Sequence, residues 1–212
     1  MKSYILWDHD GVLVHTEPWY FEATRRCIAP LGVELTQQQY LNDMPIGRTA
    51  WERARRVGAS EEDIARQRQE RDLLYQRFLR DEDIDIPSVA PTLETLALDY
   101  AMAIVTTAKA ADFELIHQHR NIRQHMHFVL TSEDYQRSKP APDPYLAALE
   151  RFGAKPSQAV AVEDSERGLR SAVAAGIDCV VVANDFIRGQ NLSAAKHQIE
   201  SLAELPGLLA KL

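Results

Sequence analysis

The sequence predicts an α/β fold in which helices cover both faces of a parallel sheet. Short apolar runs alternate with amphipathic stretches, as expected for strands that are joined by helical crossovers. The runs are continuously apolar, as in Val180-Val181-Val182, which is typical of strands buried on both faces. The chain has 212 residues, of which 45% are hydrophobic, and this is enough to form a substantial core.

Five apolar runs are the predicted strands, and three amphipathic stretches between them are the predicted helices. The strands are expected at Tyr4–Trp7, Ala101–Val105, His127–Leu130, Ala159–Val162 and Cys179–Val182. The helices are expected at Ala111–Arg120, Pro144–Phe152 and Glu166–Ala175. Gly153 and Gly176 stand where the last two helices should end.

The segment from Thr16 to Pro87 has a different character. It is rich in Arg, Glu and Gln, lacks a strand pattern, and is expected to form several amphipathic helices. Because it follows the first strand directly, we interpret it as a helical insertion. The predicted domains are therefore a core made of residues 1–14 and 88–212, and a helical domain made of residues 15–87.

The first predicted strand ends in an acidic motif, Asp8-His9-Asp10-Gly11. Residues i and i+2 of an extended strand point to the same side, so Asp8 and Asp10 leave the strand end together. Two carboxylates this close repel each other unless a cation or a shared proton relieves the repulsion. Mg²⁺ prefers oxygen ligands and meets that need, while Gly11 permits a sharp turn and the close approach of a ligand.

Polar residues also follow the other predicted strands, where ligands bind in open α/β sheets. Thr106 and Thr107 follow the second strand, and hydroxyl and backbone N–H groups at such a turn suit a phosphate. Lys139 lies on a proline-stiffened loop, where it is suited to supply a positioned charge. Glu163 and Asp164 end the fourth strand. Each feature alone has a structural explanation, such as a helix cap, but their succession predicts a site.

The ordered set of motifs resembles the haloacid dehalogenase superfamily, in its phosphatase and phosphomutase branch. The matching segments are DHDGVLVHTE at 8–17, IVTTA at 104–108, SKPAPDP at 138–144 and VEDSERGLRSAVAAG at 162–176. The resemblance implies a Rossmann-like parallel sheet core with an inserted all-α cap of four helices. It also implies a phosphoric monoester hydrolase.

The resemblance implies a role for each matched position. Asp8 would be the nucleophile that forms an aspartyl-phosphate, and Asp10 would be the general acid and then the general base. The implied Mg²⁺ ligands are Asp8, Asp10 through its backbone carbonyl, Asp164 and, directly or indirectly, Glu163. The implied phosphate-binding residues are Thr106, Thr107, Lys139 and Gly11. Asp10 argues against halide displacement, since the dehalogenase branch typically lacks this second acid.

The helical insertion bears on the identity of the substrate. Where beta-phosphoglucomutases carry a cap histidine, this chain has Tyr20, and where they carry an arginine three residues after the cap-loop glycine, it has Ala50. Both departures count against a mutase. The candidate substrate contacts in the cap are Gly47, Arg48, Arg71 and Tyr20. For the two arginines, a solvated helix surface is the alternative.

Histidines form the other departures from the family pattern. His9 occupies a position that is commonly aromatic or aliphatic, so it is expected either to pack in the core or to contact the cap. His15 stands where many relatives have Asp. A later histidine-rich stretch lacks the Cys or carboxylate pattern that a transition-metal site would need. It contains His117, His119, His125 and His127.

We therefore expect a Mg²⁺-dependent phosphatase that acts on a small phosphomonoester, such as a sugar phosphate or a phosphoglycolate-like compound. The alternatives are a beta-phosphoglucomutase-like phosphomutase and a non-catalytic phosphate-binding relative. A mutase would interconvert sugar phosphates, whereas a phosphatase would release inorganic phosphate.

Composition limits the partners and the compartment. The net charge of -7 argues against a general nucleic-acid or anionic-membrane surface. No apolar run approaches the ~20 residues of a spanning helix, and the N-terminus lacks the pattern of a secretory signal. Cys27 and Cys179 do not suggest a disulfide framework or a zinc site. We expect a cytoplasmic monomer or weak homodimer whose partner is a small-molecule phosphate ester.

Overall fold

The chain forms two compact units in the computed structural model, which describes residues 2–44, 46–184, 186 and 189–211. The core unit comprises Met1–His15 and Asp85–Leu212, and the helical unit comprises Thr16–Ile84. Among the described residues, no helix is long and apolar enough to cross a membrane.

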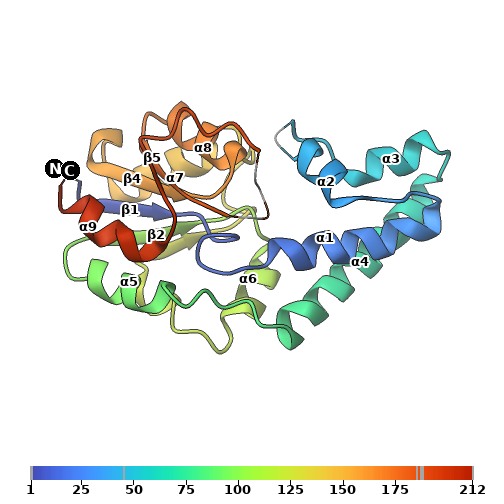
Figure 1. The fold of residues 1–212 in the computed structure, drawn as a ribbon, viewed down its shortest axis with the longest axis horizontal. Coiled ribbons are helices and arrows are strands. Elements are labelled where there is room, and N and C mark those ends of the chain that lie inside the picture. Colours follow the sequence, from blue (N-terminus) through green and yellow to red (C-terminus); the bar gives the residue numbers. More distant parts are fainter. Residues whose placement is uncertain (1, 45, 185, 187–188, 212) are drawn as a thin grey trace. The chain divides into compact units, whose positions relative to one another are not determined.

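A parallel sheet forms the centre of the core unit (Figure 1). In the described part of the chain it has 6 strands in the order β3-β2-β1-β4-β5-β6, and all neighbouring strands run parallel. The strands are β1 (Tyr4–Trp7), β2 (Ala101–Val105), β3 (Phe128–Leu130), β4 (Ala159–Glu163), β5 (Asp178–Val182) and β6 (His197–Ile199). The predicted α/β fold with a parallel sheet is confirmed.

Helices cover both faces of this sheet (Figure 1). The helices of the core unit are α5 (Val89–Leu96), α6 (Ala110–His117), α7 (Asp143–Phe152), α8 (Glu166–Ala174) and α9 (Leu205–Leu209). Leu6 of β1 belongs to an apolar cluster with Tyr145 of α7 and Leu169 of α8. Its neighbours Ile5 and Trp7 point to the opposite face and are also fully buried. Burial on both faces explains why the strand sequences are continuously apolar.

The predicted elements differ from the observed ones mainly at their ends. Helix α6 ends at His117 rather than at Arg120, and the Arg120 Nη1 group donates a hydrogen bond of 2.6 Å to the Ile116 carbonyl. The side chain thereby satisfies a carbonyl of the last helical turn. Strand β6 and helices α5 and α9 were not predicted.

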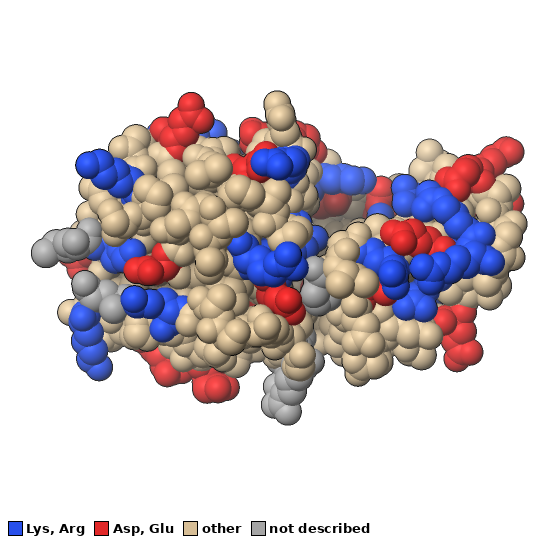
Figure 2. Space-filling view, turned by 90° about the horizontal axis from the view of Figure 1, so that it is seen from above, with Lys and Arg blue, Asp and Glu red and all other residues tan. Residues whose placement is uncertain are grey.

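The helical unit contains α1 (Glu17–Ile28), α2 (Gln37–Asp43), α3 (Ala50–Arg56) and α4 (Glu61–Asp81). It has an apolar cluster of its own, which includes Ile28, Trp51 and Ile64. Its surface charges are intermixed in the view of Figure 2, and many form ion pairs such as Arg55–Glu61 at 2.6 Å. This pairing is typical of a solvated helix surface.

The chain leaves and re-enters the core unit at neighbouring points. Val14, near the end of the first segment, forms an antiparallel bridge with Asp85, where the second segment begins. Val14 also pairs with Asp10, so the bridge is continuous with the acidic motif after β1.

Candidate active site

The site lies where the order of the strands reverses. Successive strands run from β1 towards β3 on one side and from β4 towards β6 on the other. In open α/β sheets, ligands bind at this switch point, beyond the carboxyl ends of the strands. The Asp8 N–H donates to the Val162 carbonyl at 2.8 Å, which holds Asp8 beside the end of β4. Asp8 and the Glu163–Asp164 pair are thereby brought together.

Lys139 is the centre of a buried hydrogen-bond network. Its Nζ group donates to Asp8 Oδ1, to Glu163 Oε1 and to the Val105 carbonyl, each at 2.8 Å. These three acceptors use all three hydrogens of the ammonium group. The loop after β3 thus carries its lysine to the ends of β1, β2 and β4.

The charges in this network perturb one another. Burial acts to lower the pKa of Lys139, but the negative charges of Asp8 and Glu163 outweigh it and raise that pKa above its usual range. Burial raises the pKa of Glu163, and the charge of Asp8 raises it further, whereas Lys139 opposes both effects. Lys139 is therefore a permanent cation that two carboxylates share.

The Glu163 carboxyl group is enclosed by protein on all sides. Its Oε1 atom also accepts a hydrogen bond of 2.5 Å from Tyr145 of α7, while its Oε2 atom has no hydrogen-bond partner among the described residues. Gly168 of α8 lies against it, since a Cβ atom at that position would come within 1.9 Å of Oε2. Burial raises the pKa of Tyr145 well above its usual value, so the phenol remains a donor.

The carboxylates fit a divalent cation. Asp8, Glu163 and Asp164 are buried, and one oxygen from each lies within 4.8 Å of the others. One lysine cannot balance three buried carboxylates, and a hard cation prefers such oxygen donors. Gly11 has a φ of +83°, and a Cβ atom there would lie 1.8 Å from Asp164 Oδ2. The turn after β1 thus requires glycine to leave room for this carboxylate.

Thr106 links the second catalytic candidate, Asp10, to β2. The Thr106 hydroxyl donates to Asp10 Oδ2 at 3.3 Å and accepts from the Ala108 N–H at 3.0 Å. The Tyr135 hydroxyl donates to the Thr106 carbonyl at 2.7 Å, and burial raises the pKa of Tyr135 to about 12. The threonine is fully buried, so its hydroxyl is fixed in place.

The remaining phosphate-binding candidates lie at the same edge of the sheet. Thr107 follows Thr106, and its hydroxyl accepts a hydrogen bond of 3.3 Å from the Arg167 guanidinium of α8. The Gly11 N–H donates to the Val14 carbonyl at 2.7 Å, within its own turn. For Gly11 the structure therefore shows a backbone role and clearance for Asp164.

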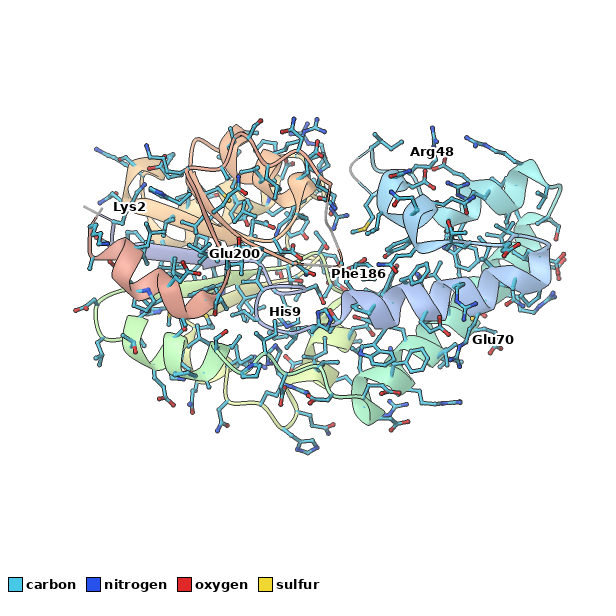
Figure 3. The ribbon with its side chains drawn as sticks, viewed as in Figure 1. Lys2, His9, Arg48, Glu70, Phe186 and Glu200 are labelled. Carbon is cyan, nitrogen blue, oxygen red and sulfur yellow. The ribbon has the colours of Figure 1, made fainter. Side chains whose placement is uncertain are left out.

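His9 lies inside the core unit, at the carboxyl end of β1 (Figure 3). Its Nε2 atom forms a hydrogen bond of 2.8 Å with Nε2 of His117 in α6, and its Nδ1 atom lies 3.4 Å from Asp10 Oδ2. Of the two expectations for His9, packing in the core describes its position, although its partner there is polar. His15 is exposed.

The cap candidates divide into two groups within the helical unit. The Arg71 guanidinium is buried and stacks over the Tyr20 ring, with 4.4 Å between its Cζ atom and the ring centroid. Gly47 and Arg48 lie in the segment between α2 and α3, and Arg48 lies 3.6 Å from Asp43 and 3.7 Å from Glu52. Arg48 is the more exposed of the two arginines.

Sequence reasoning missed several residues that support the site. Tyr145 and Gly168 lie in helices, where the apolar spacing indicated only packing, and His117 was considered only as a transition-metal ligand. Asn184 was identifiable by its position after β5, since its side-chain amide donates to Asp164 Oδ2 at 3.3 Å. A polar residue just after a predicted strand is the same signal that Asp8, Thr106 and Asp164 give.

Buried carboxylates and a lysine lie at the switch point of a parallel sheet. This arrangement is typical of α/β hydrolases that act through an aspartate at the end of a strand. The family profile described as "Haloacid dehalogenase-like hydrolase" matches residues 5–182. The chain belongs to this family.

Named relatives share most of their length with this chain. Fructose-1-phosphate phosphatase YqaB of Escherichia coli (strain K12) is 28% identical over 180 residues, covering 84% of this chain and 95% of the relative. Protein CbbY of Cereibacter sphaeroides is 28% identical over 226 residues, covering 98% and 96%. A CbbY variant from Rhodobacter sphaeroides, solved with xylulose-(1,5)bisphosphate, is 25% identical with a TM-score of 0.82, covering 97% and 96%.

Proposed function

We propose that this protein is a Mg²⁺-dependent phosphatase that hydrolyses a small phosphomonoester through an aspartyl-phosphate on Asp8. The observation that carries the proposal is the buried network in which Lys139 binds Asp8 and Glu163, with Asp164 beside them. A carboxylate is a poor nucleophile towards an anionic phosphate unless positive charge offsets their repulsion, and Lys139 supplies such charge at Asp8.

The residues of the core unit support a two-step reaction. In the first step, an Asp8 carboxylate oxygen bonds to phosphorus while the ester P–O bond breaks, and Asp10 gives its proton to the leaving oxygen. In the second step, Asp10 takes a proton from water, the water oxygen attacks phosphorus, and the bond to Asp8 breaks to release inorganic phosphate. Thr106 and Lys139 orient and neutralise the transferring group.

The carboxylates Asp8, Glu163 and Asp164 would hold the cation, together with the backbone carbonyl of Asp10. A bound Mg²⁺ would supply positive charge next to the transferring phosphoryl group. The fit rests on the three clustered carboxylates and on the clearance that Gly11 leaves for Asp164.

We propose a phosphorylated sugar or a comparably small phosphorylated metabolite as the substrate. Its support is the activity of YqaB, which is a fructose-1-phosphate phosphatase, and the sugar bisphosphate bound to the CbbY variant. Tyr20, Gly47, Arg48 and Arg71 remain proposed substrate contacts of the cap, where an arginine suits a second anionic group. Tyr20 and Ala50 continue to count against the mutase alternative.

The test is release of inorganic phosphate from a panel of sugar phosphates, phosphoglycolate and glycerol phosphate. Asp8→Asn should reduce release by more than about 1000-fold, because the amide cannot form the acyl phosphate. The matched control is Asp99→Asn, which changes an exposed aspartate of the core unit and should leave the rate unchanged. Full turnover by Asp8→Asn would refute the nucleophile assignment.

Removal of the metal gives an independent test. Chelation of divalent cations should stop phosphate release, and added Mg²⁺ should restore it. Turnover that persists after complete chelation would contradict the metal proposal. Conversion of one sugar phosphate into another without release of phosphate would replace the phosphatase by the mutase.

A further inference from the structure

Two histidines form a buried pair that the proposed reaction does not use. His9 is fully buried and His117 is nearly so, and their Nε2 atoms lie 2.8 Å apart. Phe113 packs on both rings, with centroid distances of 5.1 Å to His9 and 4.3 Å to His117. The two rings are therefore held in a fixed arrangement by packing as well as by their hydrogen bond.

The pair is connected to the acid–base candidate. His9 Nδ1 lies 3.4 Å from Asp10 Oδ2, which is the same oxygen that the Thr106 hydroxyl approaches at 3.3 Å. This separation is longer than an ideal hydrogen bond. Catalytic hydrogen bonds are often long without substrate and shorten in the substrate complex.

The positions of the ring hydrogens follow from these distances. At 2.8 Å one Nε2 atom must donate and the other must accept. If His9 donated, the hydrogen of His117 would have to lie on its Nδ1 atom, which is buried and has no hydrogen-bond partner among the described residues. A buried N–H group without an acceptor is strongly disfavoured.

In the reverse arrangement the free ring hydrogen lies on His9 Nδ1, which also makes no hydrogen bond among the described residues but has Asp10 Oδ2 3.4 Å away as an acceptor. If His117 donates from Nε2, its Nδ1 atom bears a lone pair, and His9 bears its hydrogen on Nδ1, facing the Asp10 carboxylate. Burial, together with the charges of His9 and Arg120, lowers the pKa of His117 to about 3, which agrees with a neutral ring. The geometry alone already excludes two hydrogens between the rings.

We propose that His9, oriented by His117, is a positioning residue that donates a hydrogen bond from Nδ1 to Asp10 Oδ2. This inference rests on the proposed function, since it concerns the carboxyl group that exchanges protons with the leaving group and with water. Together with Thr106, the histidine fixes one carboxyl oxygen of Asp10 and so sets the direction of the other. The His117–His9–Asp10 chain joins α6 to the acidic motif.

The first experiment reads the hydrogens directly, without turnover. Long-range ¹H–¹⁵N spectra of the ¹⁵N-histidine-labelled full chain at neutral pH should show His9 protonated on Nδ1 and His117 protonated on Nε2. Spectra of the His9→Leu and His117→Leu variants assign the two signals. A hydrogen on His9 Nε2 would overturn the proposal.

The second experiment separates positioning from packing. His117→Leu removes the donor to His9 and should lower kcat about 10- to 100-fold with little change in KM, because Asp10 acts on the reacting atoms rather than in binding. His117→Gln keeps an amide donor and should recover most of the rate and the His9 Nδ1 hydrogen. His119→Leu, at an exposed site two residues further on, is the matched control.

These outcomes distinguish the two proposals. If the wild-type protein releases no phosphate from any ester, the proposed function fails regardless of the histidine spectra. If the wild-type protein is active and His117→Leu matches its kcat, the positioning role fails while the phosphatase assignment stands. Equal losses in His117→Leu and His117→Gln, with the hydrogen absent from His9 Nδ1 in wild type, would also refute it.

Discussion

Gly168 gives the Glu163 carboxyl group the space that it occupies. A Cβ atom at this position would lie 1.9 Å from Oε2 and 2.1 Å from Cδ of Glu163, and Glu163 is fully buried and bound to Lys139. The carboxyl group therefore has no vacant direction in which to move. The identity of this residue is determined by the site rather than by the helix that contains it.

We expect Gly168→Ala to lower the free energy of unfolding by about 1–3 kcal/mol, since overpacking displaces buried groups. It should also lower kcat, because Glu163 and Lys139 shift together. Gly207→Ala in α9 is the control, since a Cβ atom there meets nothing within 4 Å. Alanine favours a helix by up to about 1 kcal/mol over glycine, so the control should be neutral or stabilising. Denaturant unfolding that showed the two variants to be alike would contradict this view of Gly168.

His117 makes the stability of the protein depend on pH. Its pKa is lowered to about 3 in the folded chain, from about 6.5 in an unfolded chain, because burial disfavours the charged ring. Below pH 6.5 the unfolded chain binds a proton that the folded chain does not, so stability falls as the pH falls towards 3. The contribution that is lost at pH 5 is about 2 kcal/mol.

We expect His117→Gln to remove this dependence. Between pH 8 and pH 5, the free energy of unfolding of the wild type should fall by about 2 kcal/mol more than that of His117→Gln. Urea unfolding at the two pH values measures it. The same slope in both proteins would show that His117 titrates normally in the folded state.

The residues of the site were predictable from sequence where they follow a strand. Asp8, Thr106, Lys139 and Asp164 lie in turns after apolar runs, and parallel strands bring such turns to one edge. Residues within helices gave no comparable signal. Tyr145 and His117 occupy buried helical positions that packing alone would explain, and only the fold shows that they face Glu163 and His9.

Helix α8 begins directly after the metal candidate Asp164. The Ser165 hydroxyl accepts a hydrogen bond of 3.1 Å from the Gly168 N–H, so the same cap that starts the helix also fixes Gly168 beneath Glu163. Ser60 caps α4 in the helical unit in the same way, accepting from the Asp63 N–H at 3.0 Å. The two helices have equivalent caps in different surroundings.

We expect Ser165→Ala and Ser60→Ala each to destabilise their helix by about 1 kcal/mol. Hydrogen exchange in the first turns of α8 and α4 measures this loss. Only Ser165→Ala should also lower kcat, because only that cap positions a residue next to the carboxylates. An equal fall in kcat for both variants would mean that general loosening, rather than the position of Gly168, sets the rate.

The strands that were predicted from the sequence and the strand that was not predicted differ in the number of apolar residues that they bury. β1, β2, β4 and β5 contain runs of at least four buried or half-buried apolar residues because both of their faces are covered, and such runs are easily recognised. β6 has three residues, of which only Ile199 is buried, and it pairs with one neighbour. A strand so short carries no periodic pattern.

At the scale of the whole molecule, the proposed chemistry belongs to one unit. Every carboxylate, lysine and threonine assigned to the reaction lies in Met1–His15 or Asp85–Leu212. The core and helical units also have separate apolar clusters. The core unit therefore contains every residue that is proposed to bind the cation, together with an apolar cluster of its own.

We expect a chain in which Thr16–Ile84 is replaced by a short Gly-Ser linker to fold cooperatively and to bind Mg²⁺. Its Mg²⁺ affinity by calorimetry should lie within about tenfold of that of the full chain, since all proposed ligands remain. The same replacement with Asp164→Asn is the control that should lose binding. A linker variant that is unfolded would show that the core depends on the helical unit.

The bridge between Val14 and Asp85 has a consequence for how this chain can change over time. The bridge holds the two ends of the inserted segment side by side, so the length of that segment has little effect on the core. Doubling the length of a flexible segment costs only about 0.6 kcal/mol in loop-closure entropy. Insertions, deletions or whole exchanges in that segment leave the strand register of the core untouched. We therefore expect that the inserted segment can be lengthened, shortened or exchanged while the acidic motif after β1 keeps its place.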